Sequence, residues 1–188
     1  MIGVLALQGN YRMHSKMLFD MNEENLLVRD AQDLSKCKGL IIPGGESTVI
    51  SKMMIRYNLL EPIKKFSQNN GIFGTCAGLI IMSNYDSDNI KTLNIINIDI
   101  SRNAWGRQIN SFTKDIKINL DKTKKIFRAT FIRAPRIEGV TGNIDTLAYL
   151  NKEPVMVRQG RHIGTTFHPE MHKDPSIHKY FLEINNER

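Results

Sequence analysis

The stretch Gly74-Thr75-Cys76-Ala77-Gly78 stands between the apolar pair Ile72-Phe73 and the apolar run Leu79-Ile80-Ile81-Met82. This order predicts a buried strand, an abrupt turn and a buried helix. The pattern Gly-x-Cys-x-Gly is the cysteine counterpart of the nucleophile elbow, in which flanking glycines avoid a collision with neighbouring backbone. The sulfur then lies at a helix N-terminus, where the dipole favours thiolate, and the Ala77 N–H points to where an oxyanion would form. The stretch therefore predicts a reactive Cys76; the alternative is a small buried cysteine in a glycine-rich turn.

Length and composition limit what this chain can be. Its 188 residues, of which 41% are hydrophobic and 24% charged, fit one globular domain over residues 1–188. No apolar run approaches the length needed to cross a bilayer, and Cys37 and Cys76 form no disulfide framework, so we expect a cytoplasmic protein with reduced thiols. The net charge is +7, but the lysines are scattered and no aromatic residues alternate with them. We therefore expect a solvated basic surface, or one for a protein partner, rather than a nucleic-acid or membrane site.

The first half of the chain alternates short apolar runs with helical patterns. Strands are expected at residues 1–7, 26–28, 39–42 and 72–73, and helices at residues 11–21, 49–57, 62–68 and after Cys76. Continuous apolar strands that alternate with helices indicate a parallel sheet buried on both faces. After Met82 we expect half-exposed strands at residues 93–100, 115–120, 126–132 and 147–150, a final hairpin at residues 155–158 and 163–167, and a closing helix from Pro175. The predicted fold class is α/β: a three-layer, open, mostly parallel sheet with helices on both faces, of flavodoxin-like type.

A second glycine-rich loop, Pro43-Gly44-Gly45-Glu46-Ser47-Thr48, follows the expected strand at residues 39–42. Two glycines let the backbone approach a ligand closely, and loops at the carboxyl ends of strands are where open α/β sheets bind ligands. The alternative is a tight turn with no other role. Ser47 or Thr48 is expected to cap the following helix, as Asp33 is expected to cap a brief turn earlier in the chain.

A thiolate nucleophile needs a base, and His168 is the candidate among the five histidines. It alone follows an apolar strand and is followed two residues later by a carboxylate, Glu170. On extended backbone, residues two apart point to the same side, and Pro169 favours extended shapes, so Glu170 is expected to reach one ring nitrogen of His168. The alternative is a surface histidine beside a surface glutamate. No third ligand of suitable spacing indicates a metal site.

The elbow together with Phe167-His168-Pro169-Glu170 resembles the class I (triad) glutamine amidotransferase family. Within that family, further motifs resemble the branch that supplies ammonia to pyridoxal 5′-phosphate synthases. These motifs are Leu7-Gln8-Gly9, Pro43-Gly44-Gly45-Glu46-Ser47-Thr48, Arg102-Asn103-Ala104-Trp105-Gly106-Arg107-Gln108 and Phe131-Ile132-Arg133-Ala134-Pro135. The resemblance runs from residue 7 to residue 170, which is nearly the whole chain. Departures from the family pattern are the short polar segment at residues 85–92, the following Leu93-Asn94, and Met13, where an acidic residue is common.

The resemblance implies that the chain hydrolyses L-glutamine to L-glutamate and ammonia. Cys76 would attack the carboxamide, His168 would act as base and then as acid, and Glu170 would orient His168. The N–H groups of Gly45 and Ala77 would hold the oxyanion. Glutamine itself would be bound by Gly45, Glu46, Ser47, Arg102, Ile132 and Arg133. The resemblance implies no metal ion and no cofactor.

The resemblance also implies a partner, a (β/α)₈-barrel synthase subunit that joins the ammonia to a pentose phosphate and a triose phosphate within a large hetero-oligomer. In this family the Gly44-Gly45 loop is expected to reach its active shape only when that subunit docks. Two other hypotheses stay open. One is a glutaminase that serves imidazole glycerol phosphate synthesis, whose partner is also a barrel. The other is a non-enzymatic or stress-response protein with an elbow cysteine on a similar sheet.

Overall fold

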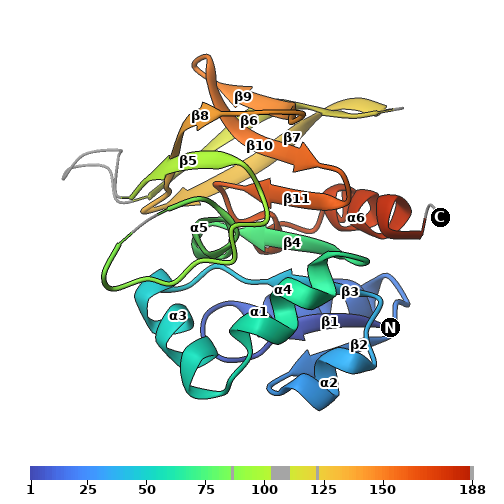
Figure 1. The fold of residues 1–188 in the computed structure, drawn as a ribbon. Helices are drawn as coiled ribbons and strands as arrows, with labels where there is room; N and C mark the ends of the chain where they lie inside the picture. Colours follow the sequence, from blue (N-terminus) through green and yellow to red (C-terminus); the bar gives the residue numbers. More distant parts are fainter. Residues whose placement is uncertain (86, 103–110, 122, 187–188) are drawn as a thin grey trace.

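The computed structural model describes residues 1–85, 87–102, 111–121 and 123–186. Within these residues the main sheet has nine strands, in the order β2-β1-β3-β4-β11-β10-β9-β6-β7. Figure 1 shows this order from β2 at the bottom of the view to the antiparallel strands at the top. A separate antiparallel pair is formed by β5 (Ile98–Ser101) and β8 (Arg136–Val140).

The first five strands of this order are parallel: β2 pairs with β1, β1 with β3, β3 with β4, and β4 with β11. Their bounds are β1 (Ile2–Leu5), β2 (Asn25–Val28), β3 (Gly39–Ile42), β4 (Gly71–Thr75) and β11 (His162–Thr165). Every residue of β1, β3 and β4 is buried, because both faces of the sheet are covered there. This is why these strands read as unbroken apolar runs in the sequence.

The remaining strands extend the sheet in antiparallel fashion from β11 through β10, β9, β6 and β7. They are β10 (Glu153–Gln159), β9 (Asp145–Leu150), β6 (Ser111–Leu120) and β7 (Thr123–Ile132). The second half of β6 alternates exposed and buried residues, as expected for a strand with one solvated face. The α/β class with helices on both faces is confirmed, and the sheet is mixed, with a parallel and an antiparallel part.

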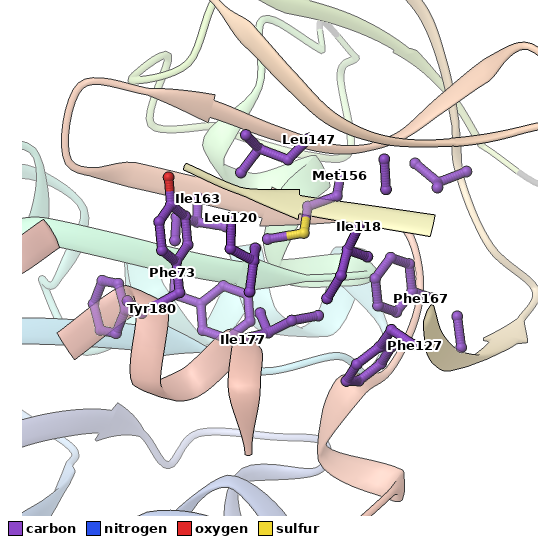
Figure 2. Packing of buried hydrophobic residues seen from close by; sticks show 14 of the residues in the cluster. Phe73, Ile118, Leu120, Phe127, Leu147, Met156, Ile163, Phe167, Ile177 and Tyr180 are labelled. Carbon is purple, nitrogen blue, oxygen red and sulfur yellow. The ribbon is translucent and has the colours of Figure 1, made fainter. Parts of the chain in front are cut away.

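Helices cover both faces of the parallel part. One hydrophobic cluster contains residues of α1 (Tyr11–Asp20) and α6 (Ser176–Asn186). The other contains residues of α2 (Ala31–Ser35), α3 (Ser47–Arg56), α4 (Leu60–Ser67) and α5 (Ala77–Met82). Successive strand residues separate the two: Phe73 belongs to the first cluster and Ile72 to the second. Figure 2 shows the first cluster, in which Phe73, Phe127 and Phe167 lie among aliphatic side chains from both parts of the sheet.

Several sequence expectations need correction at their boundaries. The strand expected at residues 93–100 is present only as β5, because Leu93 and Ile95 donate their N–H groups to the last carbonyls of α5, those of Ile81 and Met82. The short strand β8 was not expected. Its apolar residues lie among Arg136, Glu138 and Gly139, so the sequence lacks a clear alternating signal.

Two helix caps also differ from expectation. Asp30, not Asp33, caps the helix α2. The Asp30 carboxylate accepts the N–H of Asp33, which lies in the first turn of the helix. The helix α3 begins at Ser47 after Glu46, and no side chain in the described part of the structure caps it, so neither Ser47 nor Thr48 does. Instead, the side chain of Gln8 accepts the Glu46 N–H at 2.8 Å.

The carboxyl ends of the parallel strands meet at one edge of the sheet. The loops that follow β1, β3, β4 and β11 therefore lie together, and they carry Gln8, Gly45, Cys76 and His168. Among the described residues, no helix is long and apolar enough to cross a membrane.

Candidate active site

The turn between β4 and α5 has the geometry of a nucleophile elbow. Cys76 has φ +48° and ψ −104°, a region that side-chain-bearing residues seldom adopt. A β-carbon at Gly78 would overlap the carbonyl oxygen of Ile42, and one at Gly74 would lie 2.7 Å from the carbonyl carbon of Gly78. The glycines on either side of Cys76 are therefore required by close backbone approach, as the sequence pattern predicts.

A cavity of about 650 Å³ opens over this turn. It is lined by Gln8, Asn10, Gly44, Gly45, Glu46, Ser47, Cys76, Ala77, Ile80, Arg102, Ile132, Arg133 and His168. The structure thus brings together every site residue expected from the sequence except Glu170, which is buried behind His168 and does not line the cavity.

His168 lies between Cys76 and Glu170. Its Nδ1 is 2.7 Å from Glu170 Oε1, and His168 lines the cavity together with Cys76, which interacts with the ring closely enough to raise its pKa. The route to this contact differs from the expected one, because Pro169–Met171 form a short 3₁₀ helix, η1, instead of extended backbone. This tight turn brings the Glu170 carboxylate back beside the imidazole ring of His168.

The charges of this group are strongly coupled. Burial lowers the pKa of His168, but the hydrogen bonds and charges of Cys76 and Glu170 outweigh it and raise the pKa to about 10. Burial raises the pKa of Glu170, but His14 and the hydrogen bond and charge of His168 outweigh it and lower the pKa to about 2. At neutral pH the geometry therefore favours an imidazolium between a carboxylate and the sulfur.

Asn10 contacts Glu170, and the sequence analysis did not predict it as a site residue. Its side-chain Nδ2 donates to Glu170 Oε1 at 3.2 Å, and its backbone N–H donates to the Gly44 carbonyl at 2.9 Å. Asn10 directly follows the Leu7-Gln8-Gly9 motif, after the carboxyl end of the first strand. This position was the only feature of the sequence that could have indicated a role in the site. It connects the carboxylate of the site to the glycine-rich loop.

The loop at residues 43–48 is held at several points. The Gly44 N–H donates to Thr75 Oγ1 at 2.9 Å, which ties the loop to the last residue of β4. A β-carbon at Gly45 would overlap Gln8 Oε1, so this position must be glycine while Gln8 holds the start of α3. Because a trans peptide directs its C=O and N–H in opposite directions, the Gly45 N–H points away from Asn10, which binds the Gly44 carbonyl.

The far wall of the cavity comes from the ends of two antiparallel strands, β7 of the main sheet and β5 of the separate pair. Ile132 ends β7, and its carbonyl oxygen lies 3.7 Å from the Cys76 sulfur in a hydrogen bond. Arg133 follows with φ +44°, and Arg102 follows β5. Residues 103–108, which complete the motif that begins at Arg102, lie outside the described residues. In the described parts of the chain, no group of three or more His, Cys, Asp or Glu side chains could hold a metal ion.

Comparisons with known proteins agree on one family. The model of the SNO glutamine amidotransferase family matches residues 4–187. A relative from Oenococcus oeni, called pyridoxal 5′-phosphate synthase subunit PdxT, is 43% identical over 187 residues, which are 99% of this chain and 97% of that protein. A relative of the same name from Pelotomaculum thermopropionicum is 43% identical over 184 residues, 97% of this chain and 93% of that protein.

Solved structures give the same picture. A crystal structure of a glutamine amidotransferase has a TM-score of 0.90 and 37% identity, and covers 98% of both chains. A putative GMP synthase subunit from Thermoplasma acidophilum, 16% identical with a TM-score of 0.68 over 98% of this chain and 92% of that one, shares the fold.

Proposed function

The chain belongs to the SNO glutamine amidotransferase family, and on that premise we propose that Cys76, His168 and Glu170 carry out its reaction. It is a glutaminase that hydrolyses L-glutamine to L-glutamate and ammonia, and it works as the ammonia-donating subunit for pyridoxal 5′-phosphate synthesis. One observation supports the assignment of roles above all others: His168 is buried between the sulfur of Cys76 and the carboxylate of Glu170, 2.7 Å from the latter.

The first half of the reaction forms a thioester. The Cys76 thiolate attacks the carboxamide carbon of glutamine, and the carbonyl oxygen becomes an oxyanion near the N–H groups of Ala77 and Gly45, which line the cavity. The His168 imidazolium then gives its proton to the amide nitrogen. The C–N bond breaks, ammonia leaves, and the glutamyl group stays on the sulfur.

The second half releases glutamate. A water molecule attacks the thioester carbon while neutral His168 accepts its proton. The C–S bond breaks, the thiolate is restored, and His168 is again an imidazolium beside Glu170. Glu170 keeps the ring oriented in both halves through its 2.7 Å contact with Nδ1 and stays ionised because its pKa is lowered to about 2.

Glutamine binding is assigned to the wall that faces the elbow. The guanidinium groups of Arg102 and Arg133 offer planar pairs of donors for the α-carboxylate. Glu46 supplies the negative charge for the α-ammonium group, with Ser47, Gly45 and the Ile132 backbone as further polar contacts. All of these residues line the same cavity, which supports the assignment.

The partner is proposed to be a (β/α)₈-barrel synthase subunit in a large hetero-oligomer. A groove beside the buried Glu170 supports a protein partner: Met13, Met17, Met21 and Met171 line it together with charged and polar side chains, and Met13 and Met171 are exposed. We further propose that residues 1–188 act as a single domain and that the protein works in the cytoplasm, where Cys76 stays reduced.

The proposed function is tested by following the amide nitrogen. Glutamine labelled with ¹⁵N in the amide is supplied to the protein together with its synthase, the pentose phosphate and the triose phosphate. We expect ¹⁵N in pyridoxal 5′-phosphate and an equal release of glutamate, both lost in Cys76→Ala. Glutamate release with no ¹⁵N in pyridoxal 5′-phosphate, or no glutamate release at all, would refute the proposal.

A further inference from the structure

Two buried histidines lie behind the proposed catalytic group. His14 of α1 and His178 of α6 are fully buried, and His14 Nδ1 is 2.9 Å from His178 Nε2. The other ring nitrogen of His14 lies 3.4 Å from Glu170 Oε2 and 3.3 Å from Thr75 Oγ1. Helices from opposite ends of the chain thus place an imidazole pair against the carboxylate that orients His168.

The hydrogen bonds of Glu170 leave one oxygen for His14. Oε1 receives His168 Nδ1 at 2.7 Å and Asn10 Nδ2 at 3.2 Å. Oε2 is buried and, among the described residues, has no hydrogen bond of ordinary geometry, while His14 Nε2 is 3.4 Å away. Because a buried carboxylate oxygen without a donor is strongly disfavoured, an N–H on His14 Nε2 is the arrangement that satisfies this oxygen.

The neighbours of His14 decide which ring nitrogen carries the proton. If Nδ1 carried it, a bare Nε2 would place its lone pair against the anionic oxygen of Glu170. If Nε2 carries it, Nδ1 accepts the N–H of His178 Nε2, and His178 Nδ1 is bare. His178 Nδ1 has no partner among the described residues, which disfavours a proton on it. Both contacts favour the Nε2–H form of His14.

Charge favours the same form. Burial lowers the pKa of His14, His168 lowers it further, and the attraction of Glu170 does not compensate. Burial and His14 together lower the pKa of His178 to about 3. The titratable groups that face His14 are Glu170 from η1, His168 just before it and His178 from α6, whereas β4 presents Thr75 and the ring of Phe73. Both lowered pKa values favour the neutral forms of the two histidines at neutral pH.

Resting on the proposed function, we propose that His14 is a positioning residue of the glutaminase: as the neutral Nε2–H form, held by His178, it holds the Glu170 carboxylate in the rotamer that serves His168. His14 is not among the residues that line the substrate cavity, so it acts on the reaction through its neighbours: Glu170 and His168 on one side, and Thr75, which holds the Gly44 N–H, on the other. The pH profile separates the two, because only the link through Glu170 changes the pKa of His168. Without the His14 N–H, the carboxylate is less stable as an anion and free to turn away from His168. The imidazolium then loses support and its pKa falls.

The experiment compares three variants in complex with the synthase. His14→Phe keeps a flat ring but removes the donor, and we expect kcat to fall about tenfold to a hundredfold with KM changed less than about twofold. The alkaline limb of the kcat/KM profile, which reports loss of the His168 proton, is expected to move to lower pH. His14→Gln can place an amide N–H near the same point and is expected to recover most of the rate and the wild-type limb.

His162→Gln is the matched control. This histidine also has a pKa lowered by burial, to about 4, and it contacts a backbone N–H, that of Ile72, at 3.2 Å. It stands at the opposite end of the parallel strands from the site, at the first residue of β11. We expect its variant to keep both the rate and the pH profile. Wild-type turnover and an unmoved alkaline limb in His14→Phe, or a His14→Gln variant as impaired as His14→Phe, would overturn the proposal.

A measurement on the unmodified protein does not depend on how the variants fold. The ¹⁵N shifts of labelled histidines should show His14 neutral with its proton on Nε2 at about pH 7. A charged His14 or a proton on Nδ1 would overturn the proposal. An inactive wild-type complex would refute the proposed function, whereas an active one with the wrong His14 tautomer would refute only the role of His14.

Discussion

The α-carbon of Gly44 lies directly against the imidazole ring of His168. A β-carbon at this position would overlap His168 Cε1 and would lie 2.9 Å from Nδ1, the nitrogen that contacts Glu170. The glycine-rich loop after β3 therefore packs so closely against His168, the proposed base after β11, that no methyl group fits between them. The position of the ring depends on the absence of a side chain more than a hundred residues earlier in the chain.

This contact predicts the effect of Gly44→Ala. The added methyl group pushes the imidazole off its line between Cys76 and Glu170, and we expect turnover to fall about a hundredfold, since a displacement near 1 Å at a reacting group costs that much. Gly139→Ala in β8 is the control, because its β-carbon would come no nearer than 3.1 Å, to the movable end of the Asp99 side chain. Steady-state glutaminase assays of both variants, each with the synthase, measure the effect. Wild-type turnover in Gly44→Ala would contradict the proposed steric role of this glycine.

Cys76→Ala and Cys76→Ser are expected to abolish glutamine hydrolysis while the protein still folds and binds the synthase. The reason is that the thiolate is the nucleophile, and a hydroxyl in its place is not ionised. Cys37→Ala should retain activity, because Cys37 is partly buried, donates to the Asp33 carbonyl at 3.4 Å, and has its pKa raised by burial. A glutamine-mimicking electrophile should label Cys76 alone in mass spectra. Label on Cys37 would count against the scheme.

Arg102→Lys and Arg133→Ala are expected to raise KM for glutamine more than they lower kcat. Both arginines line the cavity, and contacts to the α-carboxylate are made equally before and during the reaction. Lysine keeps the charge but cannot reproduce a planar two-pronged contact. Saturation curves for glutamine measure the effect, and unchanged KM in both variants would mean that the carboxylate is bound elsewhere.

The free protein is expected to be a poor glutaminase that the synthase activates. In this structure the Asn10 N–H holds the carbonyl of the Gly44–Gly45 peptide. With glycine on both sides, the peptide can flip when that hydrogen bond breaks, so two orientations can lie within a few kcal/mol of each other. Only the orientation with the Gly45 N–H towards the substrate completes the oxyanion hole, and loss of one such donor costs roughly a hundredfold to a thousandfold in turnover. The degree of activation is measured as the ratio of turnover at saturating glutamine with excess synthase to turnover without it. Equal values would show that the loop is already set in the free protein.

Two neutral histidines, the half-buried His162 and the fully buried His178, predict a loss of stability in mild acid. The pKa of His162 is about 4 in the folded protein, against an ordinary value of 6.5, so the unfolded chain binds the proton more readily. The stabilisation is complete above about pH 6.5 and is lost as the pH falls to about 4, with a limit on the order of 3 kcal/mol for this residue. The lowered pKa of His178, about 3, acts in the same direction.

Denaturant unfolding at a series of pH values tests this linkage. The wild-type free energy of unfolding should decrease steadily across that interval, and His162→Gln should decrease less steeply because glutamine does not titrate there. Parallel curves for the two proteins would show that His162 is as easily protonated in the folded state as in the unfolded chain.

The sequence by itself determined the local geometry around Cys76 and the parallel part of the sheet. Gly74 and Gly78 encode close backbone approach, and unbroken apolar strands encode burial on two faces; both signals lie within a few consecutive residues. The same holds for the pairing of His168 with Glu170, which are two residues apart. The sequence prediction of extended backbone between them was wrong: the chain forms a 3₁₀ turn, because the backbone shape after His168 depends on what packs around it.

Only the tertiary structure decided the contacts between distant segments. Asn10 reaches Glu170 across 160 positions, and His14 meets His178 across 164. Nothing near these residues in the sequence signals such contacts, since an asparagine after a strand and histidines in helices are common and have many possible partners. They become specific when β1, β4 and β11 align in parallel, because that alignment places the start of α1 and the loop after β11 at one edge of the sheet and buries their polar groups together.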